Sequence, residues 1–338
     1  MMLNIIWFLL VGVLIIGYAI LDGFDLGVGI LQLFTKDKKE KRVNINAIGP
    51  VWDGNEVWLL TGGGALFAAF PIVYATVFSG FYLAFMLLLA ALIFRAVSFE
   101  FRKYVESDKA KGYWDLAFSV GSLLPAVLYG VAFGNILRGL PIDKDGNFLG
   151  SFIGLLNPYA ILVGLVSLTM FTLHGAIYLT LKTEGAHKER MTGMINKLWI
   201  AFVVIYFAAT VFSFFEASYL FSTVMKNPLF WLLLIVLFGS IISIPVLVKA
   251  QKNGYAFLAS SVMIACMTLL SALSLFPRLV PSNINLDYSL TIFNASSTAR
   301  TLETMLIIAL IGMPIVIGYT IFVYRVFRGK TEITKESY

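Results

Sequence analysis

Two pairs of acidic residues lie within apolar stretches that are long enough to cross a membrane. Asp22 and Asp25 belong to DGFDLGVG at 22–29, and Asp53 and Glu56 belong to GPVWDGNEVWLL at 49–60. Each pair is spaced three residues apart, so its members share one face of a helix. A charge at the bilayer centre costs about 2.5–3.5 kcal/mol on insertion scales, and intramembrane acids therefore usually mark proton or ion pathways.

Few basic residues are available to balance these acids. Arg95, Glu100 and Arg102 follow in LIFRAVSFEFR at 92–102. One or two arginines cannot neutralise four carboxylates, so some carboxyls are expected to hold or share protons. The sequence thus predicts a proton pathway, with Arg95, Glu100 and Arg102 as supporting charges; a purely structural ion-pair network is the alternative. The pathway residues are Asp22, Asp25, Asp53 and Glu56. Trp58 beside them is either an anchor at the membrane interface or a shield of the polar cluster.

The composition is that of a membrane protein. The 338 residues are 59% hydrophobic and 13% charged, whereas soluble domains carry about a quarter charged residues. The net charge of +6 does not indicate nucleic-acid binding, because basic residues of membrane proteins gather on cytoplasmic loops. We therefore expect an all-α polytopic protein of the cell membrane.

Nine stretches are long and apolar enough to serve as membrane-spanning helices. With the N-terminus outside and the C-terminus cytoplasmic, 20 of the 25 lysines and arginines lie on the inner side, which is a strong positive-inside bias. The chain is predicted to form a single transmembrane domain, 1–338, in which Pro71 separates the second and third spans. The predicted spans are 5–33, 48–70, 72–94, 114–136, 157–181, 196–221, 228–248, 255–276 and 300–326.

The remaining distinctive residues have structural interpretations. Gly23 and Gly27 form a small-xxx-small pair that favours close helix packing. His174 is expected to be a hydrogen-bonded core residue, and His187 to be solvated in a charged loop. Because haem needs axial ligands that are scarce here, the chain is expected to hold no haem and no metal by itself. The sequence assigns no role to Glu216 or Glu303.

A proton- or sodium-coupled transporter is the alternative from another functional class. Transporters also combine buried acids with broken helices, but usually in two related halves. Here the acidic and glycine-rich features are confined to residues 17–102.

Several segments together resemble subunit II of the cytochrome bd-type quinol oxidases. In the first hundred residues the resemblance rests on GYAILDGFDLGVG, GPVWDGNEVWLLTGGGALFAAFPIVYA, FSGFYLAFM and LIFRAVSFEFR. Later segments are GVAFGNIL, LLNPYAILVG and SLFPRLVPS. The resemblance extends from residue 5 to about 325, and acid, glycine and tryptophan spacings agree together.

This resemblance implies a terminal respiratory oxidase that oxidises quinol and reduces dioxygen to water. Subunit I would carry two haems b and one haem d, and subunit II would be haem-free, with two four-helix bundles and one further helix. A very small third subunit is often present, and some relatives hold a structural quinone in subunit II. Protons would come from the cytoplasm.

The family motifs also imply roles for individual residues. Asp53 and Trp58 would line a route for protons or oxygen, with Asp22 and Asp25 beside it, and Arg95 would match the arginine of the third helix. The sequence departs from some relatives at Val51, where they have histidine, and at Ala96, where many have proline.

Overall fold

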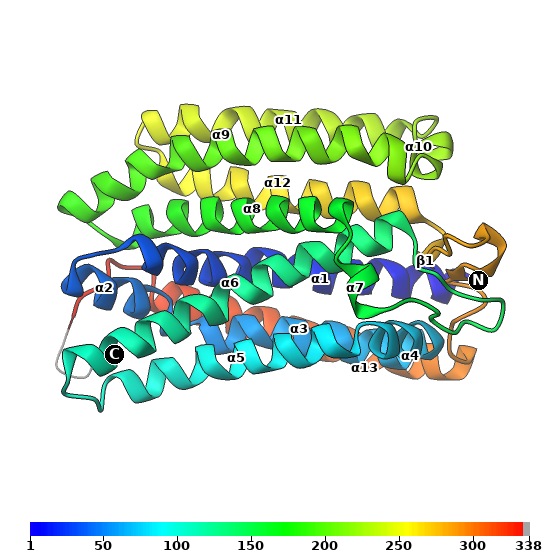
Figure 1. Ribbon diagram of the computed structural model, residues 1–338, viewed down its shortest axis with the longest axis horizontal. Helices are drawn as coiled ribbons and strands as arrows, with labels where there is room; N and C mark the ends of the chain where they lie inside the picture. Colours follow the sequence, from blue (N-terminus) through cyan, green and yellow to red (C-terminus); the bar gives the residue numbers. More distant parts are fainter. Residues whose placement is uncertain (334–338) are drawn as a thin grey trace.

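The computed structural model describes residues 1–333, apart from the side chain of Thr223. Long helices run along one common axis (Figure 1). Within the described residues, eight helices are long and apolar enough to cross a membrane, which confirms an all-α polytopic membrane fold. They are α1 (Met2–Leu31), α5 (Tyr82–Arg102), α6 (Asp108–Arg138), α8 (Pro158–Lys182), α9 (Gly185–Glu216), α11 (Pro228–Lys249), α12 (Asn253–Leu275) and α13 (Ala299–Val326).

The helix that carries Asp53 and Glu56 is α3 (Trp52–Ala69), which packs beside α1. It ends at Ala69, two residues before Pro71, and α4 (Pro71–Gly80) begins with that proline. The predicted break at Pro71 is therefore confirmed; proline is tolerated in a first turn, where its missing N–H leaves no bond unmade. A second break at Phe81 separates α4 from α5, which continues to Arg102. Arg95, expected at the end of this span, thus lies inside α5.

Short elements close the two ends of the bundle. The 3-10 turn η1 (Gln32–Phe34) and the helix α2 (Lys38–Ile48) connect α1 to α3. At the opposite end, the loops after α6 and α12 pair through the isolated bridge between Leu140 and Ser282. The remaining short elements are α7 (Phe152–Leu155), α10 (Tyr219–Val224), β1 (Arg278–Val280), η2 (Leu286–Tyr288) and β2 (Leu290–Thr291), which pairs antiparallel with β1.

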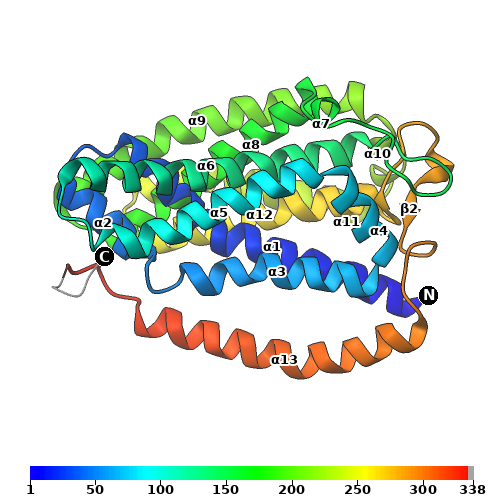
Figure 2. The same cartoon turned by 60° about the horizontal axis from the view of Figure 1, so that its bottom comes forward.

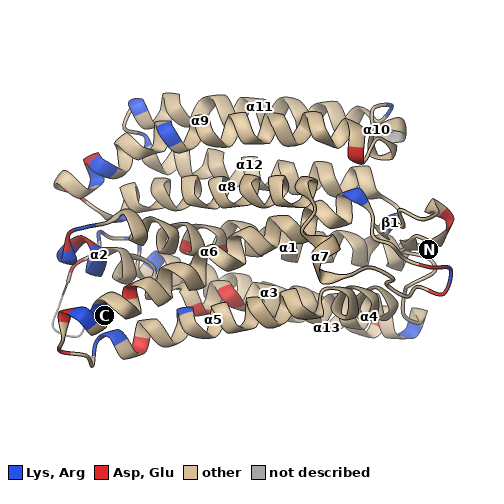
Figure 3. Cartoon of the chain, in the orientation of Figure 1, with Lys and Arg blue, Asp and Glu red and all other residues tan. Residues whose placement is uncertain are grey.

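The core lies around α1, α6, α8 and α12, which pack against one another. By contrast, α13 lies at the periphery beside α3 (Figure 2), and Leu302 is its only buried residue. The start of α1 and the end of α13 lie at opposite ends of the long axis. Most lysines and arginines gather at the end that holds α2 (Figure 3). We call this end the basic end.

Candidate functional site

A fully buried arginine organises the acidic site. Arg95 Nη2 lies 2.9 Å from Asp22 Oδ1, and Arg95 Nη1 lies 3.2 Å from Glu56 Oε2. The arginine and Asp22 have no exposed surface, whereas the Glu56 side chain is 20% exposed. Arg95 is enclosed because α6 approaches α5 closely at Gly121, where a Cβ atom would lie 2.6 Å from the carbonyl oxygen of Ala91. A guanidinium in this position requires anionic partners, and α1 and α3 supply them.

Asp25 lies in the same buried site but pairs with no cation. Asn55 Nδ2 donates to Asp25 Oδ2 over 2.7 Å. Among the described residues, three buried polar atoms of this site have no hydrogen-bond partner: Asp22 Oδ2, Asp25 Oδ1 and Arg95 Nε. One guanidinium thus stands beside three carboxyls and pairs with two of them, Asp22 and Glu56, and a proton or bound water is needed to satisfy the remaining oxygens. We call Asp22, Asp25, Glu56 and Arg95 the Arg95 cluster.

Asp53 is not part of the Arg95 cluster. It lies one turn before Glu56 at the start of α3, but its side chain is on the exposed face of the helix. The structure thus brings together three of the four predicted acids and places the fourth outside. Spacing alone could not show this, because positions 53 and 56 lie about 60° apart around the helix, and the edge of the buried face falls between them.

The two tryptophans of this segment pack against neighbouring helices. Trp58 is half-buried and covers Gly17 of α1, where a Cβ atom would overlap the indole ring. Trp52 stacks on Phe99 of α5, with ring centroids 4.8 Å apart. The two rings therefore pack α3 against α1 and α5.

The other two predicted supporting charges lie in separate ion pairs. Glu100 is exposed and pairs with Lys103 at 2.7 Å. Arg102 is buried, and its Nε lies 2.6 Å from Asp115 Oδ1 on α6. Neither group contacts the Arg95 cluster, because both lie beyond it toward the basic end.

A second polar network at the basic end was missed by sequence reasoning. Gln32 Nε2 donates to Asp115, and Asn44 Nδ2 donates to Gln32 Oε1 over 3.1 Å. His187 Nε2 lies 2.8 Å from Asn44 Oδ1, and its Nδ1 lies 3.3 Å from Glu40 Oε2. His187 was expected to be solvated; that expectation is wrong, because the first turn of α9 packs onto α2. Gln32 and Asn44 carry no charge, and only Gln32, at the end of an apolar stretch, could have been noticed in the sequence.

His174 has a well-defined structural environment on α8. Its Nδ1 lies 2.7 Å from Ser260 Oγ, and its Nε2 lies 3.1 Å from the carbonyl oxygen of Ile20. The ring stacks on Phe257 with centroids 4.6 Å apart. Both ring nitrogens are therefore hydrogen-bonded within the chain, as expected for a satisfied core histidine.

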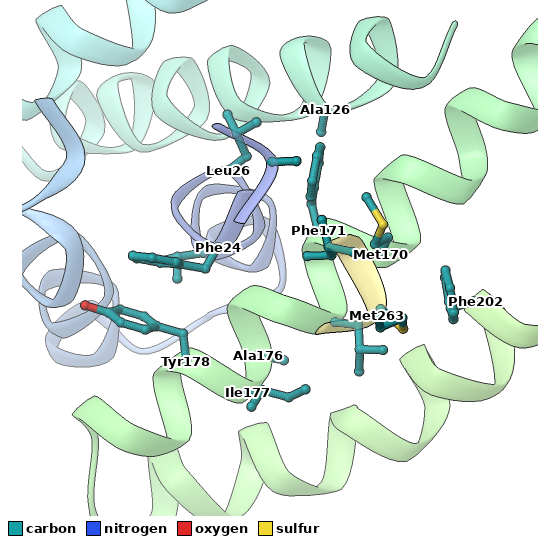
Figure 4. Close-up of a cluster of buried hydrophobic side chains, with 14 of the residues drawn as sticks. Phe24, Leu26, Ala126, Met170, Phe171, Ala176, Ile177, Tyr178, Phe202 and Met263 are labelled. Atoms are coloured by element: carbon teal, nitrogen blue, oxygen red, sulfur yellow. The ribbon is translucent and has the colours of Figure 1, made fainter. Parts of the chain in front are cut away.

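Gly23 and Gly27 lie where α1 crosses α8. A Cβ atom on Gly23 would lie 2.7 Å from the Phe171 ring, and one on Gly27 would overlap the Phe171 carbonyl oxygen. Figure 4 shows the Phe171 ring beside Leu26 of α1 and Ala126 of α6. This close approach determines the position of α1, and hence of Asp22 and Asp25.

Comparison with known proteins decides which family this site belongs to. The family described as "Cytochrome bd terminal oxidase subunit II" matches residues 3–327. The chain belongs to this family. Cytochrome bd-I ubiquinol oxidase subunit 2 of Escherichia coli (strain K12) is 38% identical, covering 99% of this chain and 96% of the relative. Cytochrome bd ubiquinol oxidase subunit 2 of Bacillus subtilis (strain 168) is 39% identical, covering 96% of each.

A solved structure supports the same fold. The structure of bd oxidase from Geobacillus thermodenitrificans contains a chain that aligns with a TM-score of 0.81 at 16% identity. The match covers 97% of this chain and 99% of that chain.

The family resemblance drawn from the motifs is thereby confirmed. As a subunit II, the chain is a component of an oxidoreductase complex of the respiratory chain and a multi-pass protein of the cytoplasmic membrane. A partner subunit I is implied by the family, and the haems are carried by the complex. Membership of this family leaves no need for the transporter hypothesis.

Proposed function

We propose that this chain is the haem-free subunit of a bd-type quinol oxidase and provides a proton route to its haem-bearing partner. The complex would couple quinol oxidation to reduction of dioxygen to water. The single observation that carries the proton role is the Arg95 cluster, in which one cation pairs with two of three carboxyls and leaves Asp25 without a counter-charge. The haem-free role is supported by His174, whose two ring nitrogens are already hydrogen-bonded.

In this proposal, the excess proton of the cluster is held at Asp25. Asp22 and Glu56 each contact Arg95, whereas Asp25 contacts only the neutral amide of Asn55. A buried carboxylate without a cation is strongly disfavoured, and protonation removes the charge. The unpartnered Asp25 Oδ1 and Asp22 Oδ2 lie one helical turn apart on α1. A proton or a water molecule between them would satisfy both oxygens.

Asp53 and Trp58 would form the outer part of the same route. Asp53 is exposed at the start of α3, on the side of the basic end, and Glu56 is one turn further in and partly exposed. A proton taken up at Asp53 would pass to Glu56 and then to Asp22 and Asp25. Trp58 would keep bulk water away from the inner acids.

The proposed orientation places the basic end in the cytoplasm and the N-terminus outside. Clustering of lysine and arginine at that end supports it (Figure 3). The start of α1 and the end of α13 also lie at opposite ends of the molecule, which requires an odd number of crossings between them. With α3 counted as a span, nine crossings form one transmembrane domain, 1–338. Two four-helix bundles would be α1, α3, α4–α5 and α6, then α8, α9, α11 and α12, with α13 as the extra helix.

The partner would carry two haems b and one haem d, and a very small third subunit would complete the complex. The exposed apolar face of α13 supports a broad protein contact beside α3, because the only buried residue of α13 is Leu302. Asp53 lies on the exposed face of α3 and would therefore face this contact.

A structural quinone, which some relatives hold, would fit a cavity of this chain. A cavity of about 200 Å³ lies between α6, α8, α9, α11 and α12. It is lined mainly by apolar and aromatic side chains, and the Tyr129 hydroxyl beside it is buried without a hydrogen-bond partner among the described residues. This phenol could donate to a quinone carbonyl. Quinone content per haem, measured after extraction of the purified complex, should fall in Ser271→Leu, which fills the cavity.

The proton role can be tested in the purified complex. Asp53→Asn and Asp25→Asn should each lower oxygen consumption while leaving the haem spectrum and subunit content intact. Asp108→Asn is the matched control, since this exposed acid at the basic end pairs only with exposed Lys38. Unchanged turnover in both intact variants would reject the proton route. Loss of assembly in both would favour a purely structural cluster.

A further inference from the structure

The helix α13 forms side-chain hydrogen bonds with the rest of the protein near its two ends. Near its start, Trp7 Nε1 donates to the carbonyl oxygen of Leu302 over 2.9 Å. Near its other end, the Tyr324 hydroxyl lies 2.9 Å from Asn55 Oδ1 on α3. The long segment between these contacts packs loosely and is largely exposed (Figure 2). The hydrogen bond from Tyr324 to Asn55 therefore joins α13 to α3 at a defined position.

The geometry of Asn55 determines the direction of this contact. Asn55 Nδ2 lies 3.1 Å from the carbonyl oxygen of Leu21 and 2.7 Å from Asp25 Oδ2. A carbonyl oxygen can only accept, so the nitrogen of the amide faces α1 and the oxygen faces Tyr324. The phenol must then donate to Asn55. Asn55 uses both N–H groups and its carbonyl oxygen, and it is 2% exposed.

Asp25 depends on this amide for its orientation. Its carboxyl accepts a hydrogen bond from Asn55 and, within the part of the chain that the structure describes, forms no ion pair with a lysine or arginine. Donation by Tyr324 to the amide oxygen polarises the amide and strengthens its N–H donors. Two successive hydrogen bonds thus connect Tyr324 of α13 through Asn55 of α3 to Asp25, the acid that holds the proton in the proposed function.

We propose that Asn55 and Tyr324 are positioning residues that orient the Asp25 carboxyl, so that proton transfer at Asp25 requires α13 to be seated on α3. The proposal rests on the proposed function but concerns two residues outside the acidic motif. Because α13 also presents the exposed apolar face, contact with a partner on that face would be communicated to Asp25 through one phenol.

The test uses infrared difference spectra of the whole complex. The carboxyl or carboxylate band of Asp25 is identified by its loss in Asp25→Asn. Tyr324→Phe, which removes one hydroxyl and keeps the ring, should shift this band. Tyr319→Phe is the matched control, because it removes an exposed phenol from the same helix. A band that is unmoved in Tyr324→Phe would overturn the proposal.

Turnover gives a second, independent readout. Tyr324→Phe should lower oxygen consumption on the order of threefold to tenfold, the range expected for one net hydrogen bond, and should displace its pH profile without loss of haem. Asn55→Leu should do at least as much, and the double variant no more than Asn55→Leu alone, since the residues act in series. If the losses of turnover caused by the two substitutions multiply in the double variant, the proposed series of hydrogen bonds from Tyr324 to Asp25 is refuted. Unchanged turnover in Asp25→Asn would reject the proton route, whereas the infrared shift would still test the positioning.

Discussion

Arg95 Nη2 and Asp22 Oδ1 lie 2.9 Å apart, and neither side chain has any exposed surface. Such a pair is costly to form in a membrane, because both charges lose their hydration. It is even more costly to break, because the remaining charge stays buried without its partner. The Arg95 cluster is therefore expected to respond very differently to loss of its cation and to loss of its unpaired acid.

Loss of the cation should destabilise the protein strongly. Arg95→Met leaves Asp22 and Glu56 without a counter-charge, and breaking a buried pair in this way costs about 3–5 kcal/mol. We expect a marked fall in the Tm of the purified complex, or failure to assemble. Lys103→Met is the control, since its exposed pair with Glu100 should contribute at most about 1 kcal/mol. Equal Tm values for the two variants would mean that Arg95 is not a buried counter-ion.

Substitution of the two acids of α1, Asp22 and Asp25, should change the Tm in different ways. Asp22→Asn removes a direct partner of Arg95 and should lower the Tm. Asp25→Asn replaces a carboxyl that has no cation, and asparagine closely matches a protonated carboxyl in shape, so the Tm should stay unchanged or rise. Thermal unfolding of both variants, with haem content as the assembly control, measures the difference. A similar loss of Tm in Asp25→Asn would show that Asp25 is ionised and stabilising.

Close packing of α1 on α8 predicts a position-specific effect of alanine. Gly27→Ala would place a Cβ atom on the Phe171 carbonyl oxygen, and overpacking of this kind costs about 1–3 kcal/mol. Gly12→Ala, on the same helix, meets nothing within 4 Å and should be neutral or slightly stabilising. Tm values of the two complexes provide the comparison. If both substitutions are neutral, α1 and α8 are further apart than the structure indicates.

Sequence reasoning predicted the helical architecture and most of the Arg95 cluster. Long apolar stretches leave helices as the economical solution in lipid, and the i,i+3 pair on α1 placed Asp22 and Asp25 on a common buried face. It did not predict which acids of α3 turn inward, because exposure of Asp53 depends on the rotation of α3 against α1. Nor did it predict Asn55 and Tyr324, since their contact joins residues 269 positions apart and leaves no local pattern.

His187 provides a further test at the basic end, where sequence reasoning was wrong. The buried imidazole donates from Nε2 to Asn44 Oδ1, because both amide N–H groups of Asn44 face acceptors, Gln32 Oε1 and Thr35 Oγ1. His187→Ala would leave the Asn44 oxygen buried without a donor, which costs about 1–3 kcal/mol. His187→Gln can place an amide N–H close to the position of Nε2 and should retain much of the stability.

The measurement is the Tm of the two complexes together with proteolysis of the loop that joins η1 to α2. A lower Tm and faster cleavage in His187→Ala, with recovery in His187→Gln, would show that α9 holds α2 in place through this hydrogen bond. Equal behaviour of the alanine and glutamine variants would contradict it, because the hydrogen-bond donor would then be irrelevant. In that case the ion pair of Arg190 with Glu40, at 2.7 Å, would be a polar contact that still joins the two helices.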